Sequence, residues 1–251
     1  MSPVNGPRFA GATVIVTGAG SGIGRATTER LVEEGAHVVA ADVSEPRLQE
    51  LKAALGDAVT TVAGDISSQA IIQQIVDAAG GKIDGLANIA GIMDGFLPTA
   101  ELDDETWDRV LSVNLTAMMK LSRAVLPVMI ASGRGSIVNV SSEAGLRGSA
   151  AGTAYTTSKH AVIGLTKSTS FFYTPKGIRC NAVGPGAVAT NIEAPFRSQW
   201  AQERLGPLMQ TNVPGVAHAS ELAAAITWLL SDDSSNVSGA VLADDGGWAA
   251  I

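Results

Sequence analysis

Cysteine and histidine are both scarce in this sequence, which holds one cysteine and three histidines among 251 residues. A single cysteine, Cys180, cannot form a disulfide within the chain, and this is typical of proteins in a reducing compartment. No metal site is expected, because no histidine lies at ligand spacing from Cys180. We interpret His37, His160 and His218 as structural, since none has a nucleophilic or metal-ligating partner in the sequence.

Positive charge is also scarce: 17 lysines and arginines oppose 24 aspartates and glutamates, and the formal net charge is −7. No basic cluster offsets this balance, so a nucleic-acid partner is not expected. Long apolar runs are absent as well, because none approaches the ~18 residues needed to span a membrane. The segment 1–12 lacks the apolar core of a signal peptide. We therefore expect a cytoplasmic protein with no membrane partner.

What the sequence has in quantity is apolar residues, which make up 46% of the chain and predict a large buried core. Short runs rich in Val, Ile and Ala are mostly continuous rather than alternating, which is typical of strands buried on both faces. The runs span residues 12–19, 36–42, 58–65, 85–91, 135–142, 178–185 and 240–246. Helical spacing of apolar residues lies between them, as in 23–35 and 221–232. This alternation predicts an α/β fold, a doubly wound parallel sheet with helices on both faces, in one domain spanning 1–251.

One segment, 186–215, departs from this rhythm and carries no strand signal. It holds prolines and scattered large side chains, including Phe196, Trp200 and Met209. Insertions after the carboxyl end of a strand are where α/β proteins place binding loops, so we predict a substrate-binding lid. An ordinary helical excursion is the alternative.

A glycine-rich turn follows the first predicted strand, with the sequence TGAGSGIG at residues 17–24. Glycines let the backbone approach a phosphate closely, and the N-terminus of the following helix favours negative charge. The spacing differs from the G-x-G-x-x-G fingerprint, because position 23 is isoleucine. The pattern favours a dinucleotide site, and a glycine-rich turn without a ligand is the alternative.

The second predicted strand ends at Asp42, 18 residues after Gly24. A carboxylate at this place accepts hydrogen bonds from the ribose hydroxyls of the adenosine and repels a 2′-phosphate. This predicts NAD in preference to NADP. Two alternatives stay open, because Asp42 or Ser44 could cap the next helix, and Arg47 could contact a phosphate.

Tyr155 and Lys159 are four residues apart, so they share one face of a helix. Together with the turn and Asp42 they form a pattern that resembles the short-chain dehydrogenases/reductases, from Thr13 to Trp248. The family's motifs stand here as Thr17–Gly24, N-I-A-G at Asn88–Gly91, Asn114, Ser142, Y-x-x-x-K at Tyr155 and Lys159, and Pro185–Gly186 followed by Val188 and Thr190. The second motif departs from the family in carrying Ile89 where another asparagine is usual.

The resemblance implies a Rossmann-type, seven-stranded parallel sheet and a reversible hydride transfer between a nicotinamide and a carbonyl or alcohol. The catalytic residues that it implies are Asn114, Ser142, Tyr155 and Lys159. A free tyrosine is a poor base near neutral pH, so we expect the ammonium of Lys159 to lower the pKa of Tyr155. Tyr155 would then act as general base or acid while Ser142 holds the substrate oxygen. By the same resemblance, Lys159 holds the nicotinamide ribose, and Asn114 keeps a helix kink and a water for proton relay.

The resemblance also implies which residues contact the cofactor. The expected set is Gly18, Ser21, Gly22, Ile23, Gly24, Asp42, Asp65, Ile66, Asn88, Ala90, Gly91, Tyr155, Lys159, Pro185, Gly186, Val188 and Thr190. Within it, Asp65 is expected at the adenine, and Val188 and Thr190 at the carboxamide.

The expected substrate is a ketone or secondary alcohol with apolar bulk, because the residues that follow the two motifs around it are mostly apolar. These are Ile92, Met93, Ala144 and Leu146, with Glu143 as a polar exception of unassigned role. We therefore predict an NAD-dependent alcohol dehydrogenase or ketone reductase. A 3-oxoacyl-thioester reductase that uses NADPH is one alternative, and a non-catalytic dinucleotide-binding protein is another.

Aromatic residues make up 4% of the chain, yet Phe171, Phe172 and Tyr173 stand together where the family usually has residues of the Ala-Leu-Glu kind. Such a cluster indicates a distinctive helix face, either in the core or between subunits. Members of the family are commonly tetramers, and the apolar tail 246–251 suits an interface. We expect a homotetramer.

Overall fold

A computed structural model describes residues 7–192 and 194–250 and contains one seven-stranded parallel sheet. The strands are β1 (Thr13–Thr17), β2 (His37–Asp42), β3 (Val59–Ala63), β4 (Gly85–Asn88), β5 (Gly135–Val140), β6 (Ile178–Pro185) and β7 (Val241–Asp244). Their order across the sheet is β3-β2-β1-β4-β5-β6-β7, so the chain adds β2 and β3 on one side of β1 and β4 to β7 on the other. Each strand lies within one of the apolar runs, and the prediction of a Rossmann-type α/β fold is confirmed.

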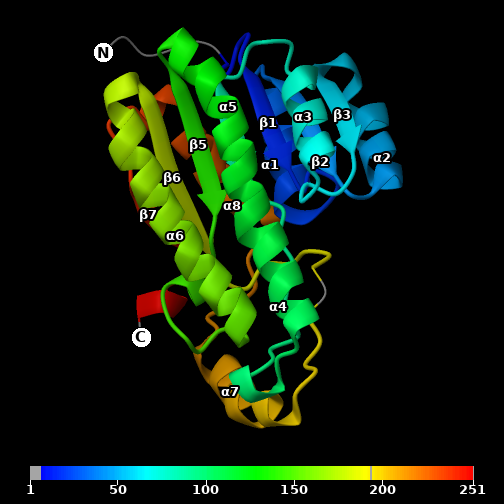
Figure 1. Cartoon of the computed structure of the whole chain (residues 1–251), viewed down its shortest axis with the longest axis vertical. Coiled ribbons are helices and arrows are strands. Elements are labelled where there is room, and N and C mark those ends of the chain that lie inside the picture. The colour runs from blue at the N-terminus through cyan, green and yellow to red at the C-terminus, as the bar shows by residue number, and fades with distance from the viewer. Residues whose placement is uncertain (1–6, 193, 251) are drawn as a thin grey trace.

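Helices cover both faces of this sheet (Figure 1). They are α1 (Gly22–Glu33), α2 (Glu45–Leu55), α3 (Gln69–Ala78), α4 (Asp104–Leu111), α5 (Met118–Ser132), α6 (Thr153–Tyr173), α7 (Gln199–Asn212) and α8 (Ala219–Leu230). In Figure 1, α4, α5 and α6 lie in front of the sheet and α8 lies behind it. Helix α7 lies apart from both layers, beyond the carboxyl ends of the strands.

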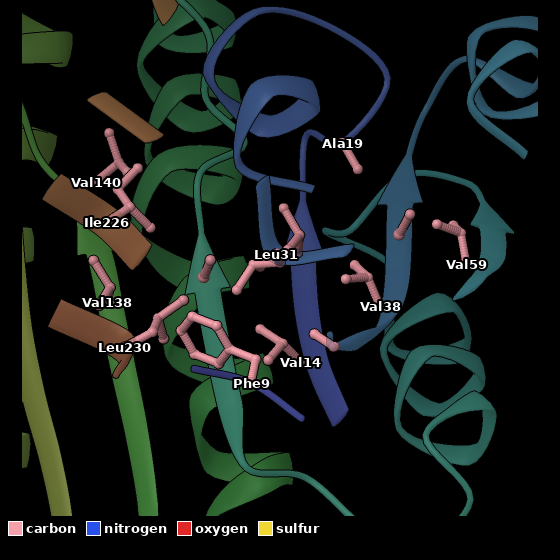
Figure 2. Close-up of a cluster of buried hydrophobic side chains, with 14 of the residues drawn as sticks. Phe9, Val14, Ala19, Leu31, Val38, Val59, Val138, Val140, Ile226 and Leu230 are labelled. Atoms are coloured by element: carbon pink, nitrogen blue, oxygen red, sulfur yellow. The ribbon is translucent and has the colours of Figure 1, made fainter. Parts of the chain in front are cut away.

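Alternation along the strands explains why the sheet needs helices on both faces. In β1, Val14 and Val16 pack into one buried cluster with α1 and α8, whereas Ile15 between them packs into the other with α3 and α5. Figure 2 shows the first cluster, in which Leu31 of α1 and Ile226 of α8 lie against the strands. Because side chains of a strand point alternately to opposite faces, an apolar residue at every position requires a cover on each side.

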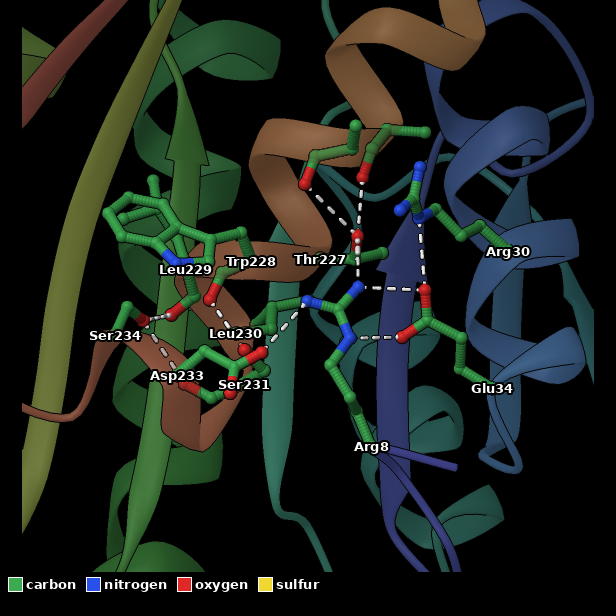
Figure 3. Close-up of polar contacts among 12 residues, drawn as sticks. Arg8, Arg30, Glu34, Thr227, Trp228, Leu229, Leu230, Ser231, Asp233 and Ser234 are labelled. Carbon is green, nitrogen blue, oxygen red and sulfur yellow. Dashed lines mark hydrogen bonds and ion pairs between the residues drawn. The ribbon is translucent and has the colours of Figure 1, made fainter. Parts of the chain in front are cut away.

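The amino ends of the strands are closed by an ion-pair network (Figure 3). Arg8 donates two hydrogen bonds to Glu34, at 2.6 and 2.7 Å, and a weaker one to Asp233 at 3.4 Å. Arg30 contacts the same carboxylate of Glu34 at 3.0 Å. The guanidinium of Arg8 therefore ties the segment before β1 to the end of α1 and to the segment after α8.

One continuous helix, Asp104–Ser132, is long and apolar enough to cross a membrane by length and composition alone. No apolar run in the sequence had suggested this. Its Leu121, Val125 and Met129 are fully buried in the core cluster that also contains Ile15, so this face packs on the sheet. The helix contains one π-helical stretch, Ser112–Ala117, which separates α4 from α5.

The segment 186–215 leaves the sheet after β6 and contains α7. It also contains Val188, which forms an isolated parallel bridge with Ala217. This bridge is not predicted by the sequence, because the residues around Val188 and Ala217 lack the apolar pattern of a strand. Loops after the other strands converge on the same edge of the sheet, as the parallel arrangement requires.

Candidate active site

A cleft of about 750 Å³ opens at the carboxyl ends of the strands. It runs from the turn after β1 and the end of β2 to Tyr155 and Trp248. The expected cofactor residues that line it are Gly18, Ser21, Gly22, Ile23, Gly24, Asp42, Asp65, Ile66, Ala90, Gly91, Tyr155, Lys159, Pro185, Gly186, Val188 and Thr190. Ser142 lines it too, whereas Asn88 and Asn114 do not.

The glycine-rich turn is shaped by contacts that only glycine allows. A Cβ on Gly24 would lie 2.0 Å from the carbonyl oxygen of Gly18, so the start of α1 sits directly against the turn. Gly22 has φ +50, a conformation that side chains rarely adopt. Helix α1 starts without a side-chain hydrogen bond from Ser21 and without an acidic residue in its first turn. Its N-terminus therefore faces the cleft as an uncompensated partial positive charge, which fits a pyrophosphate.

The end of the cleft beside β2 is formed around Asp42, which is 8% exposed. Its Oδ2 accepts a hydrogen bond from the backbone of Gly20 at 2.9 Å, and its Oδ1 accepts one from Ser44 at 2.8 Å. A carboxylate has about four lone-pair sites, so acceptor capacity remains for ribose hydroxyls. A Cβ on Gly20 would lie 2.8 Å from the Asp42 carboxyl carbon and 3.0 Å from the Cβ of Arg47. Asp42 thus serves both as an anchor of the turn and as a cleft residue.

Asp65, expected at the adenine, forms an ion pair with Arg109, a residue that the sequence analysis did not single out. Its Oδ2 lies 2.8 Å from the guanidinium of Arg109, which reaches across from α4 and also lines the cleft. Partial burial raises the pKa of Asp65, but hydrogen bonds from Ser67 and Arg109 lower it more, so the pKa lies below its usual value. The pair joins the segment after β3 to α4 across the cleft.

Tyr155, Lys159 and Ser142 meet at the other end of the cleft. Lys159 donates a hydrogen bond from Nζ to the backbone oxygen of Val140 at 2.9 Å, and Nζ lies 5.4 Å from the centre of the Tyr155 ring. The Oγ of Ser142 accepts a hydrogen bond from the backbone of Ala144 at 3.1 Å, and the Ser142 side chain is hydrogen-bonded to Tyr155. A strand end and one helix face therefore supply a hydroxyl, a phenol and an ammonium at one place.

Burial controls the protonation of this group. Burial, assisted by the charge of Asp94 and opposed by the hydrogen bond with Ser142, raises the pKa of Tyr155 to about 12. Burial also lowers the pKa of Lys159 to about 8. The expected net lowering of the Tyr155 pKa is therefore not found in the protein's own residues, because burial has the larger effect. Because burial raises its pKa to about 12, the phenol of Tyr155 keeps its proton at neutral pH, while the Lys159 ammonium donates to Val140.

The two asparagines that do not line the cleft have supporting positions behind it. Asn114, fully buried in the π-helical stretch, donates to the backbone oxygen of Ile92 at 2.9 Å and accepts from its N–H at 2.8 Å. It also donates to Ser158 at 3.2 Å, which joins the loop after β4 to α6. Asn88 donates to Asn139 at 2.9 Å and so joins β4 to β5. Asn88 was expected at the cofactor, but its amide is directed into the protein.

Sequence reasoning missed several apolar residues that line the cleft together with Tyr155. They are Phe96, Val113, Ala150 and Trp248. Trp248 is 7% exposed, so this part of the tail packs inside the subunit rather than outside it. No local pattern marks these four residues, because they come from four separate segments. Val213 lines the cleft as well, but it lies in the segment 186–215 that was predicted as a lid.

Glu143, which had no assigned role, is fully buried and pairs with Arg147. The guanidinium of Arg147 lies 5.2 Å from the centre of the Trp248 ring. An acid directly after Ser142 is thus neutralised by a cation that also contacts a wall of the cleft.

Comparisons with known proteins agree with this geometry. The sequence model described as short chain dehydrogenase matches residues 12–201. A short-chain dehydrogenase/reductase of Talaromyces verruculosus is 41% identical, over 95% of this chain and 97% of the relative. The 3beta-hydroxysteroid dehydrogenase 2 of Eggerthella lenta is 40% identical, over 97% of each chain.

Solved structures are similar over nearly the whole chain. Levodione reductase has a TM-score of 0.88 at 35% identity and covers 97% of this chain and 99% of its own. A Beutenbergia cavernae protein solved with NADP has a TM-score of 0.87 at 34% identity, with coverage of 98% and 100%. A 3-ketoacyl-(acyl-carrier-protein) reductase from Brucella melitensis, in complex with NADH, has a TM-score of 0.87 at 29% identity, with coverage of 96% and 99%.

Proposed function

The chain belongs to the short-chain dehydrogenase family, and on that premise we propose that it transfers hydride between NAD(H) and a secondary alcohol or ketone with apolar bulk. Membership of the family makes it an oxidoreductase that uses a nicotinamide dinucleotide. The choice of NAD over NADP, the substrate and the roles of the site residues are parts of the proposal.

The proposed chemistry assigns the proton to Tyr155 and the substrate oxygen to Ser142. The nicotinamide cofactor supplies or accepts the hydride when it is bound. In reduction, the phenol of Tyr155 donates its proton to the carbonyl oxygen, and its pKa of about 12 keeps that proton in place at neutral pH. Ser142 donates a hydrogen bond to the same oxygen and holds it beside the phenol. We assign Lys159, one helical turn from Tyr155, to the nicotinamide ribose.

The preference for NAD rests on Asp42. Its carboxylate lines the cleft beside Gly20, where ribose hydroxyls can donate to it and a 2′-phosphate would be repelled. Arg47 lines the same part of the cleft and is the residue that argues for NADP. We give Asp42 more weight than Arg47 in this choice, because its carboxylate ends β2 and is fixed by two backbone hydrogen bonds.

Apolar bulk in the substrate is supported by the walls around Tyr155. Met93, Phe96, Val213 and Trp248 all line this end of the cleft. The likeness to a 3beta-hydroxysteroid dehydrogenase favours an alicyclic substrate, since a hydroxysteroid is an alicyclic alcohol. We propose that the single domain 1–251 carries the segment 186–215 as a substrate-binding lid, because Ile192, Met209 and Val213 from it line the cleft.

The single observation that carries this proposal is that one cleft holds both the glycine turn and the group of Ser142, Tyr155 and Lys159. The test is oxidation of NADH and of NADPH by the purified protein with aliphatic, aryl and alicyclic ketones and with 3-oxoacyl thioesters. We expect turnover of a bulky ketone with NADH. Tyr155→Phe should abolish it, while Tyr173→Phe, the same change at the other tyrosine, should not.

Two outcomes of this screen would replace the proposal. Strong preference for NADPH with a 3-oxoacyl thioester would make the protein a thioester reductase, a function that one solved structural neighbour bears in its name. Tight cofactor binding without turnover of any carbonyl would favour a non-catalytic dinucleotide-binding protein.

We also propose a homotetramer that works in the cytoplasm. Phe171 and Phe172 on α6 are 77% and 64% exposed in the single chain, and their rings meet edge to face at 5.3 Å. Such a pair on a helix face suits burial by another subunit. Tyr173 instead packs against the core of its own chain. Light scattering should give the mass of four chains, and a monomer mass would end this part of the proposal.

A further inference from the structure

The loop after β4 contains a buried carboxylate that the proposed chemistry does not use. Asp94 is 1% exposed. Its Oδ1 accepts a hydrogen bond from the backbone of Phe96 at 3.0 Å, and its Oδ2 accepts one from the backbone of Tyr155 at 2.9 Å. A side chain distant in sequence thus holds the main chain of the tyrosine that would move the proton.

The start of α6 explains why a carboxylate is needed there. The helix begins at Thr153 after Gly152, which has no side chain that could cap the first N–H groups. Asp94 supplies the missing acceptor to Tyr155, the third residue of the helix, and its negative charge also suits a helix N-terminus. The backbone oxygen of Leu97 accepts the N–H of Thr153 at 2.9 Å.

The close approach of the loop to the helix depends on a glycine. A Cβ on Gly152 would lie 2.5 Å from Oδ2 of Asp94 and 2.5 Å from the backbone nitrogen of Leu97. No side chain could occupy that space without displacing the loop. Loop 94–97 and the start of α6 are therefore fitted to each other.

The same loop also holds the segment that we propose as a lid. The backbone oxygen of Gly95 accepts the N–H of Arg197 at 2.9 Å. Phe96 has φ 58, the one positive φ of a non-glycine residue in the described ranges, and its ring stacks on Phe196 at 4.3 Å. Phe96 is 6% exposed and lines the cleft. One short loop therefore contacts the start of α6, the cleft and the lid.

We propose that Asp94 is a positioning residue, which fixes the main chain of Tyr155 and, through loop 94–97, sets the tyrosine in place relative to the lid. This rests on the proposed function only in that Tyr155 is taken as the proton donor. Asp94 itself contacts backbone groups and acts through Tyr155.

The charge of Asp94 gives this position a second consequence. It raises the pKa of Tyr155 in addition to the effect of burial. The other charged group beside the phenol ring is Lys159 on the same helix, with its Nζ 5.4 Å from the ring centre. Removing the charge of Asp94 leaves the Lys159 ammonium in place, so the pKa of Tyr155 should fall.

The sequence allows a direct test, because the chain has two tyrosines. In a Tyr173→Phe background, the ultraviolet absorbance of phenolate reports Tyr155 alone in the ligand-free protein. We expect Asp94→Asn to lower the titration midpoint of Tyr155 and to lower kcat by about 10- to 100-fold, the range for a misplaced catalytic group. The dissociation constant for NADH should stay within about threefold, since Asp94 does not line the cleft.

Asp84→Asn is the matched control. Its carboxylate also accepts a backbone N–H, that of Thr13 at 2.9 Å, but at the opposite edge of the sheet. It should leave the Tyr155 titration and kcat unchanged. Phe196→Leu supplies a second variant, on a partly exposed residue where folding is not at risk, and it should lower kcat by releasing the loop from the lid.

The outcomes separate cleanly. If Asp94→Asn lowers Tm but leaves both the phenol titration and kcat as they were, the residue is only structural and the proposal is overturned. If Asp94→Asn does not fold, an unchanged kcat in Phe196→Leu overturns it instead. Full turnover by Tyr155→Phe would refute the proposed function, while the titration would still measure the effect of Asp94 on the phenol.

Discussion

Replacing Asp42 with asparagine should convert the cofactor preference from NAD(H) toward NADP(H). The carboxylate accepts backbone N–H groups from Gly20 and Ser44, and asparagine can keep one of these two acceptors. The loss of the other hydrogen bond affects the glycine turn equally with either cofactor, so it does not change the ratio of kcat/KM for NADPH and NADH. What changes between the cofactors is the charge that faces the adenosine ribose.

The size of the change follows from Coulomb's law. Two unit charges 4 Å apart repel by about 1 kcal/mol in water and by about 4 kcal/mol near a protein surface. A phosphate carries about −1.5 to −2 charges at neutral pH. Asp42 is 8% exposed but the cleft is open, so we take the lower end, about 1.5 to 2 kcal/mol, which is at least tenfold for NADPH.

Loss of a charged acceptor for ribose hydroxyls adds to this difference. Hydrogen bonds to charged groups contribute about 1.5 to 3 kcal/mol, so binding of NADH should weaken by about tenfold or more. Together the two effects predict that the NADPH/NADH ratio of kcat/KM rises by at least ~100-fold.

The assay is steady-state oxidation of both cofactors with one confirmed ketone, at low salt and again at high salt. Glu45→Gln is the matched control, because it removes the same charge from an exposed residue three positions along the chain. It should change the ratio by less than about threefold, since its carboxylate is in solvent. A wild-type enzyme that already prefers NADPH, or an Asp42→Asn ratio within the range of Glu45→Gln, would refute the reasoning.

Other predictions follow from the buried groups and the glycines. Tyr155 should titrate near pH 12 in Tyr173→Phe, and alcohol oxidation should therefore rise with pH; a midpoint near 10 would contradict the role of burial. Burial lowers the pKa of Lys159 to about 8, so the folded chain carries a buried ammonium below that pH, and stability should rise between about 8 and 10.5. Lys159→Met should thus raise Tm at pH 7 while turnover is lost. An unchanged Tm would show that burying the Lys159 ammonium does not destabilise the fold. Gly24→Ala should destabilise by about 3 kcal/mol or more in urea unfolding, whereas Gly164→Ala, with nothing within 4 Å on an exposed helix face, should stabilise by about 0.5–1 kcal/mol. Equal effects of the two would show that the turn is not tightly packed.

Much of the fold could be predicted because its signals are local. Continuous apolar runs such as 36–42 predict strands covered on both faces, and helical spacing between them predicts the crossovers. In a parallel sheet all carboxyl ends share one edge, so residues that end different strands or follow them must gather there. Asp42 and Ser142, 100 positions apart, could be assigned to one cleft for this reason.

The parts that could not be predicted depend on contacts between distant segments. Asn88 and Asp94 follow or end the same strand, yet one side chain joins β4 to β5 and the other holds the start of α6. A one-residue step along an extended chain reverses the side to which a side chain points, and a loop has no fixed period, so sequence position alone could not separate these roles.

Sequence by itself determined the order of the strands and helices, the glycine turn and the spacing of Tyr155 and Lys159, because propensity, periodicity and a helical turn act over a few residues. Tertiary structure decided how those two groups hold their protons. The pKa of each depends on how completely other segments exclude water from it, and burial raises one and lowers the other. Which carboxylate caps the helix that carries them was likewise decided by a loop some 60 residues away in the chain.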